Sequence, residues 1–272
     1  MIPGISSYTY TWAVGVAGSM PQAALNATGL IDIAAKRGVS LVQIADNLPL
    51  ETLKPDELDA VIVYAVSKGV SLEMGGRGLT PAHTIECLET AKKIDSPILR
   101  MVIDSPRFEP ELPTIISIIR DIVPELKSGK VRLAIENHDR LKAREFEKII
   151  QSVGSDMVGI CLDSVNSIGA GEGFETVSDI LIPYTFNLHV KDFVIFRAPH
   201  KMGFTVEGRP AGQGMLNLPD LFEKVEDTGL CHSAILELWT PPADNIEDTI
   251  IKEDDWARIS INYMKSLLDM KS

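Results

Sequence analysis

Short apolar segments alternate with longer helical segments along the whole chain, and this alternation constrains the fold more than any other feature. Eight segments of strand length are each followed by a segment of helical length, and no linker interrupts the series. Such alternation is typical of parallel α/β structure. Eight units in 272 residues favour a closed (β/α)₈ barrel over an open sheet, because barrels of this type span about 250 residues. The sequence therefore predicts one TIM barrel domain over residues 1–272.

Glycine and proline residues mark the boundaries of the expected elements. Gly38, Gly69 and Gly129 close three of the expected helices, and Pro81 stands at the first position of another. No GxGxxG motif follows the first strand, which argues against a dinucleotide-binding fold. The expected strands are residues 4–10, 39–45, 70–75, 98–103, 132–137, 157–163, 186–192 and 233–239. The expected helices lie near residues 20–37, 55–68, 80–94, 110–128, 141–153, 172–182, 217–228 and 246–269.

The composition argues against several classes of function. The net charge of −12, without any run of lysine or arginine, argues against a nucleic-acid partner, because phosphate backbones are held by clustered basic side chains. No apolar stretch approaches the roughly 20 residues of a membrane span. The amino-terminal sequence lacks the basic and apolar regions of a signal peptide, so we expect a cytoplasmic protein. Three scattered cysteines, Cys87, Cys161 and Cys231, indicate neither a disulfide framework nor a thiolate zinc site.

Four of the expected strands end with ionisable side chains on one face. With the two-residue period of a strand, one face of these strands is apolar and the other carries Glu136, Asp163, His189 and Glu237. The apolar face packs under helices, and the second face points into the barrel, where charges are costly unless paired or coordinated. Three carboxylates and one imidazole form a cage for one divalent metal ion: Mn²⁺, Mg²⁺, Co²⁺ or Zn²⁺. The alternative is a salt-bridge network, but one histidine cannot balance three carboxylates.

Short motifs accompany these four residues along the chain. They are Glu136-Asn137-His138, Asp163, His189-Val190-Lys191-Asp192, Gly212-Gln213-Gly214 and Glu237. In this order, and over essentially the whole chain, they resemble the xylose isomerase-like barrels. The likeness is to the sugar phosphate isomerase/epimerase branch, which includes ketose 3-epimerases, inosose isomerases and dehydratases, and hydroxypyruvate isomerase. The resemblance implies that Glu136, Asp163, His189 and Glu237 bind one divalent cation. It also implies that Glu136 and Glu237 move protons.

The expected activity follows from the chemistry of such a site. A divalent cation bound to a carbonyl oxygen stabilises the enolate that forms when a neighbouring proton is removed. Two carboxylates on opposite faces of a ketose, Glu136 and Glu237, would make the enzyme an isomerase or epimerase of a sugar or polyol. The same enolate also permits a lyase, such as an inosose dehydratase. An apurinic endonuclease-like nuclease is the least favoured reading, because a three-zinc cluster needs more well-placed histidines than the five in this chain supply.

Side chains beside the cage are candidates for substrate contacts. His138 points in the same direction as Glu136 and either contacts a substrate hydroxyl or caps its loop. Lys191 shares the inward face with His189, and it contacts either the substrate or one of the two glutamates. Asn166 stands where ketose 3-epimerases commonly have a histidine. This departure weakens the expectation of a free-ketohexose epimerase.

Two further substrate contacts are expected at the mouth of the barrel. Trp12 follows Tyr8 and Tyr10 at the end of the first strand, where aromatic rings form a wall of a sugar pocket or part of the core. Arg209 is the best placed of the basic residues in segment 196–214, and it suits an anionic substrate. We expect this segment to act as a lid. Contact with a second subunit, and hence a homo-oligomer, is the alternative.

Three other charged residues are expected to have structural roles. Glu73 and Arg100 lie on adjacent strands, so we expect them to form an ion pair inside the barrel. Asp192 faces outward in the expected strand, and we expect it to pair with a helix or a loop.

Overall fold

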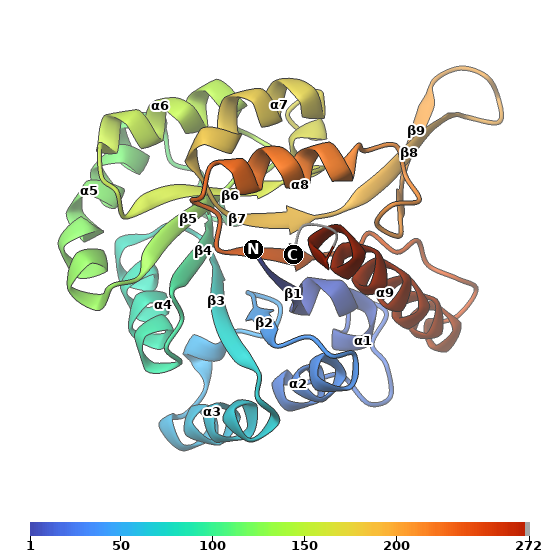
Figure 1. Ribbon diagram of the computed structural model, residues 1–272, viewed down its shortest axis with the longest axis horizontal. Helices are drawn as coiled ribbons and strands as arrows, with labels where there is room; N and C mark the ends of the chain where they lie inside the picture. The colour runs from blue at the N-terminus through green and yellow to red at the C-terminus, as the bar shows by residue number, and fades with distance from the viewer. Residues whose placement is uncertain (270–272) are drawn as a thin grey trace.

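Eight parallel strands close into a barrel that helices cover on the outside (Figure 1). The strands of the barrel are β1 (Ile2–Ser6), β2 (Leu41–Ile44), β3 (Ser71–Arg77), β4 (Ile98–Val102), β5 (Arg132–Glu136), β6 (Val158–Asp163), β7 (Thr185–Val190) and β10 (Ser233–Leu236). Their order around the barrel is β1-β10-β7-β6-β5-β4-β3-β2. This computed structural model describes residues 1–269, so residues 270–272 of the predicted domain lie outside the described part. The prediction of a single (β/α)₈ barrel is confirmed.

The helices begin and end at residues with capping chemistry. The Thr80 side chain accepts a hydrogen bond from the backbone N–H of His83 at the start of α4. Gly69, with φ of 65°, ends α3 in the left-handed conformation that glycine favours. The helices are α1 (Thr11–Val14), α2 (Ala27–Lys36), α3 (Pro55–Lys68), α4 (Pro81–Lys93), α5 (Leu112–Gly129), α6 (Ala143–Val153), α7 (Phe174–Leu181), α8 (Leu218–Asp227) and α9 (Ile246–Asp269). Short 3₁₀ helices are η1 (Ser7–Tyr10), η2 (Leu50–Thr52), η3 (Asn166–Ile168) and η4 (Ile182–Tyr184).

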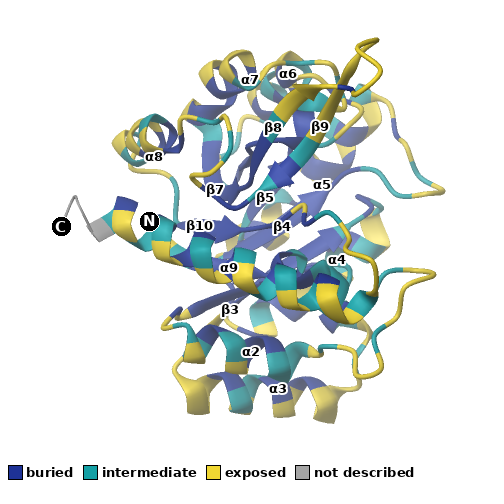
Figure 2. Ribbon diagram, turned by 90° about the vertical axis from the view of Figure 1, so that its right-hand side faces the viewer, coloured by how far each residue is buried: buried dark blue, intermediate teal, exposed yellow. Residues whose placement is uncertain are grey.

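Alternate residues of the strands enter two different environments. Leu133, Ile135 and Leu188 belong to the main apolar core, in which the sheet packs under the helices, and Figure 2 shows buried strands beneath helices whose outer faces are exposed. Ala134 and Cys161 point the other way and belong to a separate small apolar cluster. They stand two residues before Glu136 and Asp163, so this cluster lies one layer below the acids. The predicted division into an outer apolar face and an inner polar face agrees with this arrangement.

The first strand is shorter than the sequence predicted. We expected a strand over residues 4–10, but β1 ends at Ser6 and the chain turns into η1 and α1. The Ser6 side chain accepts the N–H of Tyr8, and Thr9 Oγ1 accepts the N–H of Ser6. These bonds between side chains and backbone compete with strand pairing. The aromatic residues Tyr8 and Trp12 are therefore carried on helical turns above the barrel instead of alternating along a strand.

The expected lid is a β-hairpin in the structure. Residues 196–197 of this segment end β8 (Asp192–Arg197) and residues 204–209 form β9 (Phe204–Arg209), and the two strands pair in antiparallel register. The hairpin projects outward from the barrel (Figure 1). Phe204 and Met202 are exposed on it.

Asp192 anchors the segment that follows the hairpin. Its carboxylate accepts hydrogen bonds from the backbone N–H groups of Phe193, Gly212, Gly214 and Leu216, at 2.9 to 3.2 Å. The side chain is buried, so the charge is stabilised by four donors and not by water. Pairing with a loop, as expected from the sequence, is what the structure shows for Asp192.

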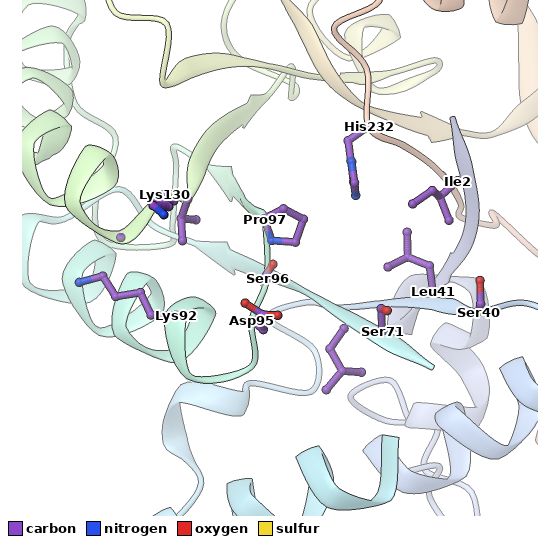
Figure 3. Close-up of a pocket in the computed structure, with 13 residues that line it drawn as sticks. Ile2, Ser40, Leu41, Ser71, Lys92, Asp95, Ser96, Pro97, Lys130 and His232 are labelled. Atoms are coloured by element: carbon purple, nitrogen blue, oxygen red, sulfur yellow. The ribbon is translucent and has the colours of Figure 1, made fainter. Parts of the chain in front are cut away.

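A cavity at the amino-terminal end of the barrel is remote from the acids. A cavity of about 510 Å³ lies where β2, β3 and β4 begin, and it is lined by residues that include Ser40, Ser71, Lys92, Lys130 and His232 (Figure 3). Sites of chemistry in this fold lie at the opposite end, where the strands finish. We therefore seek the functional site at the carboxyl-terminal ends of the strands. Within residues 1–269, no helix is long and apolar enough to cross a membrane.

Replacing Asp192 tests its role as an anchor. Asp192→Asn keeps the size of the side chain but sets an amide N–H₂ against backbone donors, so we expect the free energy of unfolding in urea to fall by about 1–3 kcal/mol. Segment 210–217 should also be cleaved faster by proteases. Asp156→Asn is the control, because its side chain is 86% exposed, and it should change stability by less than about 0.5 kcal/mol. Equal stabilities of the two variants would contradict the assignment.

Candidate metal centre

The four predicted cage residues converge at the carboxyl-terminal end of the barrel. Glu136 and Asp163 end β5 and β6, His189 lies on β7, and Glu237 directly follows β10. All four are buried. The Nδ1 atom of His189 lies 3.3 Å from Glu136 Oε2, 3.4 Å from Glu237 Oε1 and 3.8 Å from Asp163 Oδ2. The structure thus brings together the residues that the sequence analysis proposed as one ligand set.

The second nitrogen of His189 fixes the tautomer of the ring. Nε2 lies 2.7 Å from Gln43 Oε1, and the Gln43 amide nitrogen donates to Glu73 and Asn187. Because the Gln43 oxygen is an acceptor, Nε2 of His189 carries the proton. Burial lowers the pKa of His189 to about 4, which favours the neutral ring. Nδ1 therefore presents a lone pair to the carboxylates.

Glu73 supports this arrangement from below, and it does not pair with Arg100 as we had expected. Its carboxylate accepts hydrogen bonds from Gln43 Nε2 at 3.0 Å and from Ser233 Oγ at 2.6 Å. Burial raises the pKa of Glu73 to about 7. The expected Glu73–Arg100 ion pair is wrong, because the strand register places Arg100 beside Gly75, two residues beyond Glu73. Glu73 thus lies in a lower layer of the barrel interior.

Two cations pair with the acids. The Arg100 guanidinium contacts Glu136 through its Nε and lies 3.4 Å from Asp46 Oδ1. Burial opposes its charge, but the neighbouring carboxylates, Glu136 first, outweigh that effect and raise the pKa of Arg100. Lys191 Nζ lies 2.6 Å from Asp163 Oδ2 and 2.9 Å from Glu237 Oε2. Of the two uses expected for Lys191, the structure shows the salt bridge with Glu237. The argument that a single histidine must balance three carboxylates was therefore incomplete.

The donor set nevertheless fits a divalent cation. His189 Nδ1 is buried and has no hydrogen-bond partner within residues 1–269. Its neighbours at 3.3 to 3.8 Å are carboxylate oxygens, which are acceptors like itself. A buried lone pair that faces acceptors is unfavourable unless a cation lies between them. Three carboxylates and one imidazole are ligands that Mn²⁺, Co²⁺ and Zn²⁺ accept. The same oxygens serve Lys191, so its ammonium and a metal ion compete for them.

The structure places three of the predicted substrate residues beside this cluster. Asn166 Nδ2 donates to Glu136 Oε1 at 2.8 Å, which ties the amide to a cage residue. His138 lines the mouth, where its Nε2 lies 3.0 Å from a nitrogen of Arg77. Trp12 donates its indole N–H to Thr240 O at 2.8 Å. It lines a cavity of about 360 Å³ together with Lys191, Glu237 and Trp239.

Arg209 is the predicted substrate residue that the structure does not bring to the cluster. Its guanidinium contacts Glu207 and, at 2.7 Å, the carbonyl oxygen of Gly208, both in its own hairpin. Among the described residues, the lining of the two cavities at the mouth does not include it. A contact between Arg209 and the substrate stays a prediction that requires the hairpin to move.

Sequence reasoning missed several residues of the mouth. Arg77 ends β3, two residues beyond the strand that we expected, and its Nε lies 3.4 Å from Asp46 Oδ2. The Tyr8 hydroxyl donates to the same Asp46 oxygen at 3.0 Å. Trp239 stands two residues after Glu237, so the two-residue period could have found it. A cavity of about 140 Å³ is lined by Tyr8, Arg77, Arg100, Glu136, His138, Asn166, Lys191, Glu237 and Trp239.

The chain is similar to known proteins over nearly all of its length. A family model described as a xylose isomerase-like TIM barrel matches residues 76–267. The 3-oxo-isoapionate decarboxylase of Pectobacterium atrosepticum is 30% identical over 264 residues, which are 97% of this chain and 95% of that protein. A D-psicose 3-epimerase of Clostridium cellulolyticum H10, solved with D-tagatose, has a TM-score of 0.74 at 14% identity and covers 98% of this chain and 99% of its own. The IOLI protein, solved with a zinc atom, has a TM-score of 0.69 at 18% identity. The match covers 97% of this chain and 99% of the IOLI chain.

These likenesses confirm the resemblance that the motifs indicated. The solved structures share too little sequence to show more than the fold. The family model, in contrast, matches well over half of the chain, and the decarboxylase matches almost all of it. The chain belongs to the xylose isomerase-like TIM barrel family.

Proposed function

We propose that the protein is a divalent-metal-dependent lyase that decarboxylates a 3-oxo sugar acid. The observation that carries this proposal is the composition of the mouth cavity, where Arg77, Arg100 and Lys191 lie beside Glu136 and Glu237. Cations beside a metal-binding cage suit a substrate that is itself an anion. The likeness to 3-oxo-isoapionate decarboxylase supports the same substrate class. The sequence analysis considered a lyase of another kind, a dehydratase that acts on an inosose or a keto-sugar.

The reaction needs an electron sink at the substrate's ketone. In a 3-oxo acid the bond between the carboxylate carbon and C2 breaks, its electron pair moves towards the C3 oxygen, and carbon dioxide leaves. A divalent cation held by Glu136, Asp163, His189 and Glu237 would stabilise the negative charge that develops on that oxygen. C2 then takes one proton, and the carboxyl group of Glu136 or Glu237 can deliver it.

The residues at the mouth bind and orient the substrate. Arg77 and His138 lie 3.0 Å apart, and together they offer hydrogen bonds to a carboxylate or a hydroxyl. Lys191 lies 5.9 Å from the centre of the Trp239 ring, so this ammonium and the aromatic ring border the same space. The rings of Trp12 and Trp239 cover apolar parts of the substrate and keep water away from C2.

A second candidate is an isomerase or epimerase of a sugar or polyol, which the two glutamates favour. Glu136 and Glu237 come from different strands and both lie within 3.4 Å of His189 Nδ1. Carboxylates on two sides of one substrate carbon can remove a proton from one face and return it to the other. The D-psicose 3-epimerase shares this fold. A decarboxylase breaks a carbon–carbon bond, whereas an isomerase or epimerase breaks a carbon–hydrogen bond. An experiment that follows both bonds can therefore distinguish the two candidates.

The test of function is to incubate the purified protein and Mn²⁺ with a 3-oxo sugar acid in heavy water. We expect release of carbon dioxide and one solvent deuteron at the carbon that carried the carboxylate, both followed by NMR. A panel of ketoses and inososes, with the same protein and metal, is the comparison. Exchange of a ketose proton for deuterium without loss of carbon would establish the isomerase or epimerase instead. Failure on every 3-oxo acid with metal bound would overturn the proposal.

Replacing each glutamate separately distinguishes the two reactions again. An epimerase needs both carboxylates as acid and base, so Glu136→Gln and Glu237→Gln should each reduce kcat by well over tenfold, about 1.4 kcal/mol or more. A decarboxylase removes no proton, so at least one variant that still binds metal should retain release of carbon dioxide. Asp156→Asn is the control for handling, because its side chain is 86% exposed. Metal content must be measured for every variant, because both glutamates are proposed ligands.

Replacing Lys191 tests the competition between its ammonium and the metal ion. In Lys191→Met, Asp163 and Glu237 lose their buried cation, so in EDTA we expect a loss of about 3–5 kcal/mol of stability, seen as a lower Tm. Added Mn²⁺ should restore more stability to this variant than to the wild type. Lys224→Met is the control, because its pair with Asp220 is half exposed and contributes only about 0.3–0.5 kcal/mol. If Mn²⁺ raised the Tm of the wild type and of Lys191→Met equally, the ammonium and the metal ion would not share the oxygens of Asp163 and Glu237.

A further inference from the structure

A second group of metal-ligand atoms lies beside the mouth of the barrel, apart from the acids described above. His83 and Cys87 are four residues apart on α4, so their side chains lie on one face of the helix. The 3₁₀ helix η2 places Glu51 against the same face. The His83 Nε2 atom lies 3.5 Å from Cys87 Sγ and 3.9 Å from Glu51 Oε1. One ligand atom from each of the three residues lies within 4.8 Å of the others.

The two separations from His83 Nε2 are close to those of a tetrahedral zinc site. With Zn–S bonds of about 2.3 Å and Zn–N or Zn–O bonds of about 2.0–2.2 Å, tetrahedral angles separate the ligand atoms by about 3.4–3.6 Å. The distances from His83 Nε2 to Cys87 Sγ and Glu51 Oε1 need to change by only a few tenths of an ångström. The other ring nitrogen, Nδ1, lies 3.8 Å from Glu86 Oε2. A metal-bound histidine commonly directs its second nitrogen at a carboxylate in this way.

An unpartnered oxygen points independently to a ligand in this cluster. The Glu51 side chain is 7% exposed, and its Oε2 has no hydrogen-bond partner within residues 1–269. A bound cation would give this buried oxygen a partner.

We propose that Glu51, His83 and Cys87 form a second metal site, which binds Zn²⁺. One thiolate, one imidazole and one carboxylate suit zinc, whereas Mg²⁺ and Mn²⁺ prefer oxygen ligands. On binding, the Cys87 thiol loses its proton to solvent and a Zn–S bond forms. A water molecule completes the coordination. The site is built from ligands that do not belong to the acid cluster, so it stands whether or not the proposed decarboxylation is correct.

The location of the site gives it a structural role at the mouth. Glu51 lies in the connection between β2 and α3, which also carries Asp46. His83 and Cys87 lie on the helix that follows β3, which ends at Arg77. Asp46 and Arg77 are joined by an ion pair of 3.4 Å. Zinc would therefore tie together the two connections whose residues line the substrate cavity, and it would position Arg77 without touching the substrate.

Cobalt titration of the metal-free full-length protein tests the site, because Co²⁺ bound to a thiolate absorbs in the near ultraviolet. We expect this absorption in the wild type and in Cys161→Ser, and its loss in Cys87→Ser. Cys161 is the matched control, because it lies beside Glu136 and His189 in the acid cluster. In a parallel zinc titration, His83→Gln and Glu51→Gln should bind at least about 10- to 100-fold more weakly at this site. His200→Gln, in the exposed hairpin, should bind as the wild type does.

Several outcomes would overturn the proposal. They are the absence of the absorption in the wild type, its survival in Cys87→Ser, or its loss in Cys161→Ser. Because Cys87 is fully buried, its replacement could unfold the protein, and circular dichroism would reveal that. His83 is only partly buried, so His83→Gln then decides the question. Unchanged zinc affinity and stoichiometry in folded His83→Gln would leave the acid cluster as the sole metal centre among the described residues.

Discussion

The interior of the barrel depends on the burial of three carboxylates around one neutral imidazole. Glu136, Asp163 and Glu237 are all fully buried, and ionised groups there are costly unless other charges compensate. Arg100 and Lys191 supply two positive charges, which leave an excess of one negative charge when all three acids are ionised. One divalent cation would change that excess to one positive charge, and it would give the unpartnered Nδ1 of His189 a partner. The two side-chain cations thus compensate most of the buried negative charge, and Nδ1 of His189 stays without a hydrogen-bond partner within residues 1–269.

The polar layer below the acids explains why the imidazole presents this nitrogen. Gln43 accepts a hydrogen bond from His189 Nε2, and its amide nitrogen is held in turn by Glu73 and Asn187. Asn187 also donates to Ser233, so the chain of hydrogen bonds crosses four strands of the barrel. Polar groups inside a barrel are unfavourable unless each has a partner. This network therefore fixes both the tautomer and the orientation of the His189 ring.

Periodicity predicted the parts of the structure that follow from one strand at a time. The alternation of strands and helices predicted the barrel, and the two-residue period placed Glu136, Asp163, His189 and Glu237 on its inner face. Periodicity does not predict which side chains pair across neighbouring strands. Arg100 contacts Glu136, and not Glu73, because barrel closure sets Arg100 beside Ala134 on one side and Gly75 on the other. The cluster of Glu51, His83 and Cys87 was missed for a related reason, since a search for closely spaced cysteines does not find ligands from separate elements.

In the proposed function, the residues at the mouth, and not those of the cage, would select the reaction. A metal ion bound to a ketone stabilises an enolate whichever neighbouring bond breaks, so the cage alone is compatible with epimerisation and with decarboxylation. The bond that breaks is the one held perpendicular to the plane of the forming enolate, where its electrons overlap with the carbonyl. Arg77 and His138 border the cavity of about 140 Å³ that Glu136 and Glu237 also line. By fixing a carboxylate there, they would determine that orientation, and a site with neutral side chains at these positions would lose the preference.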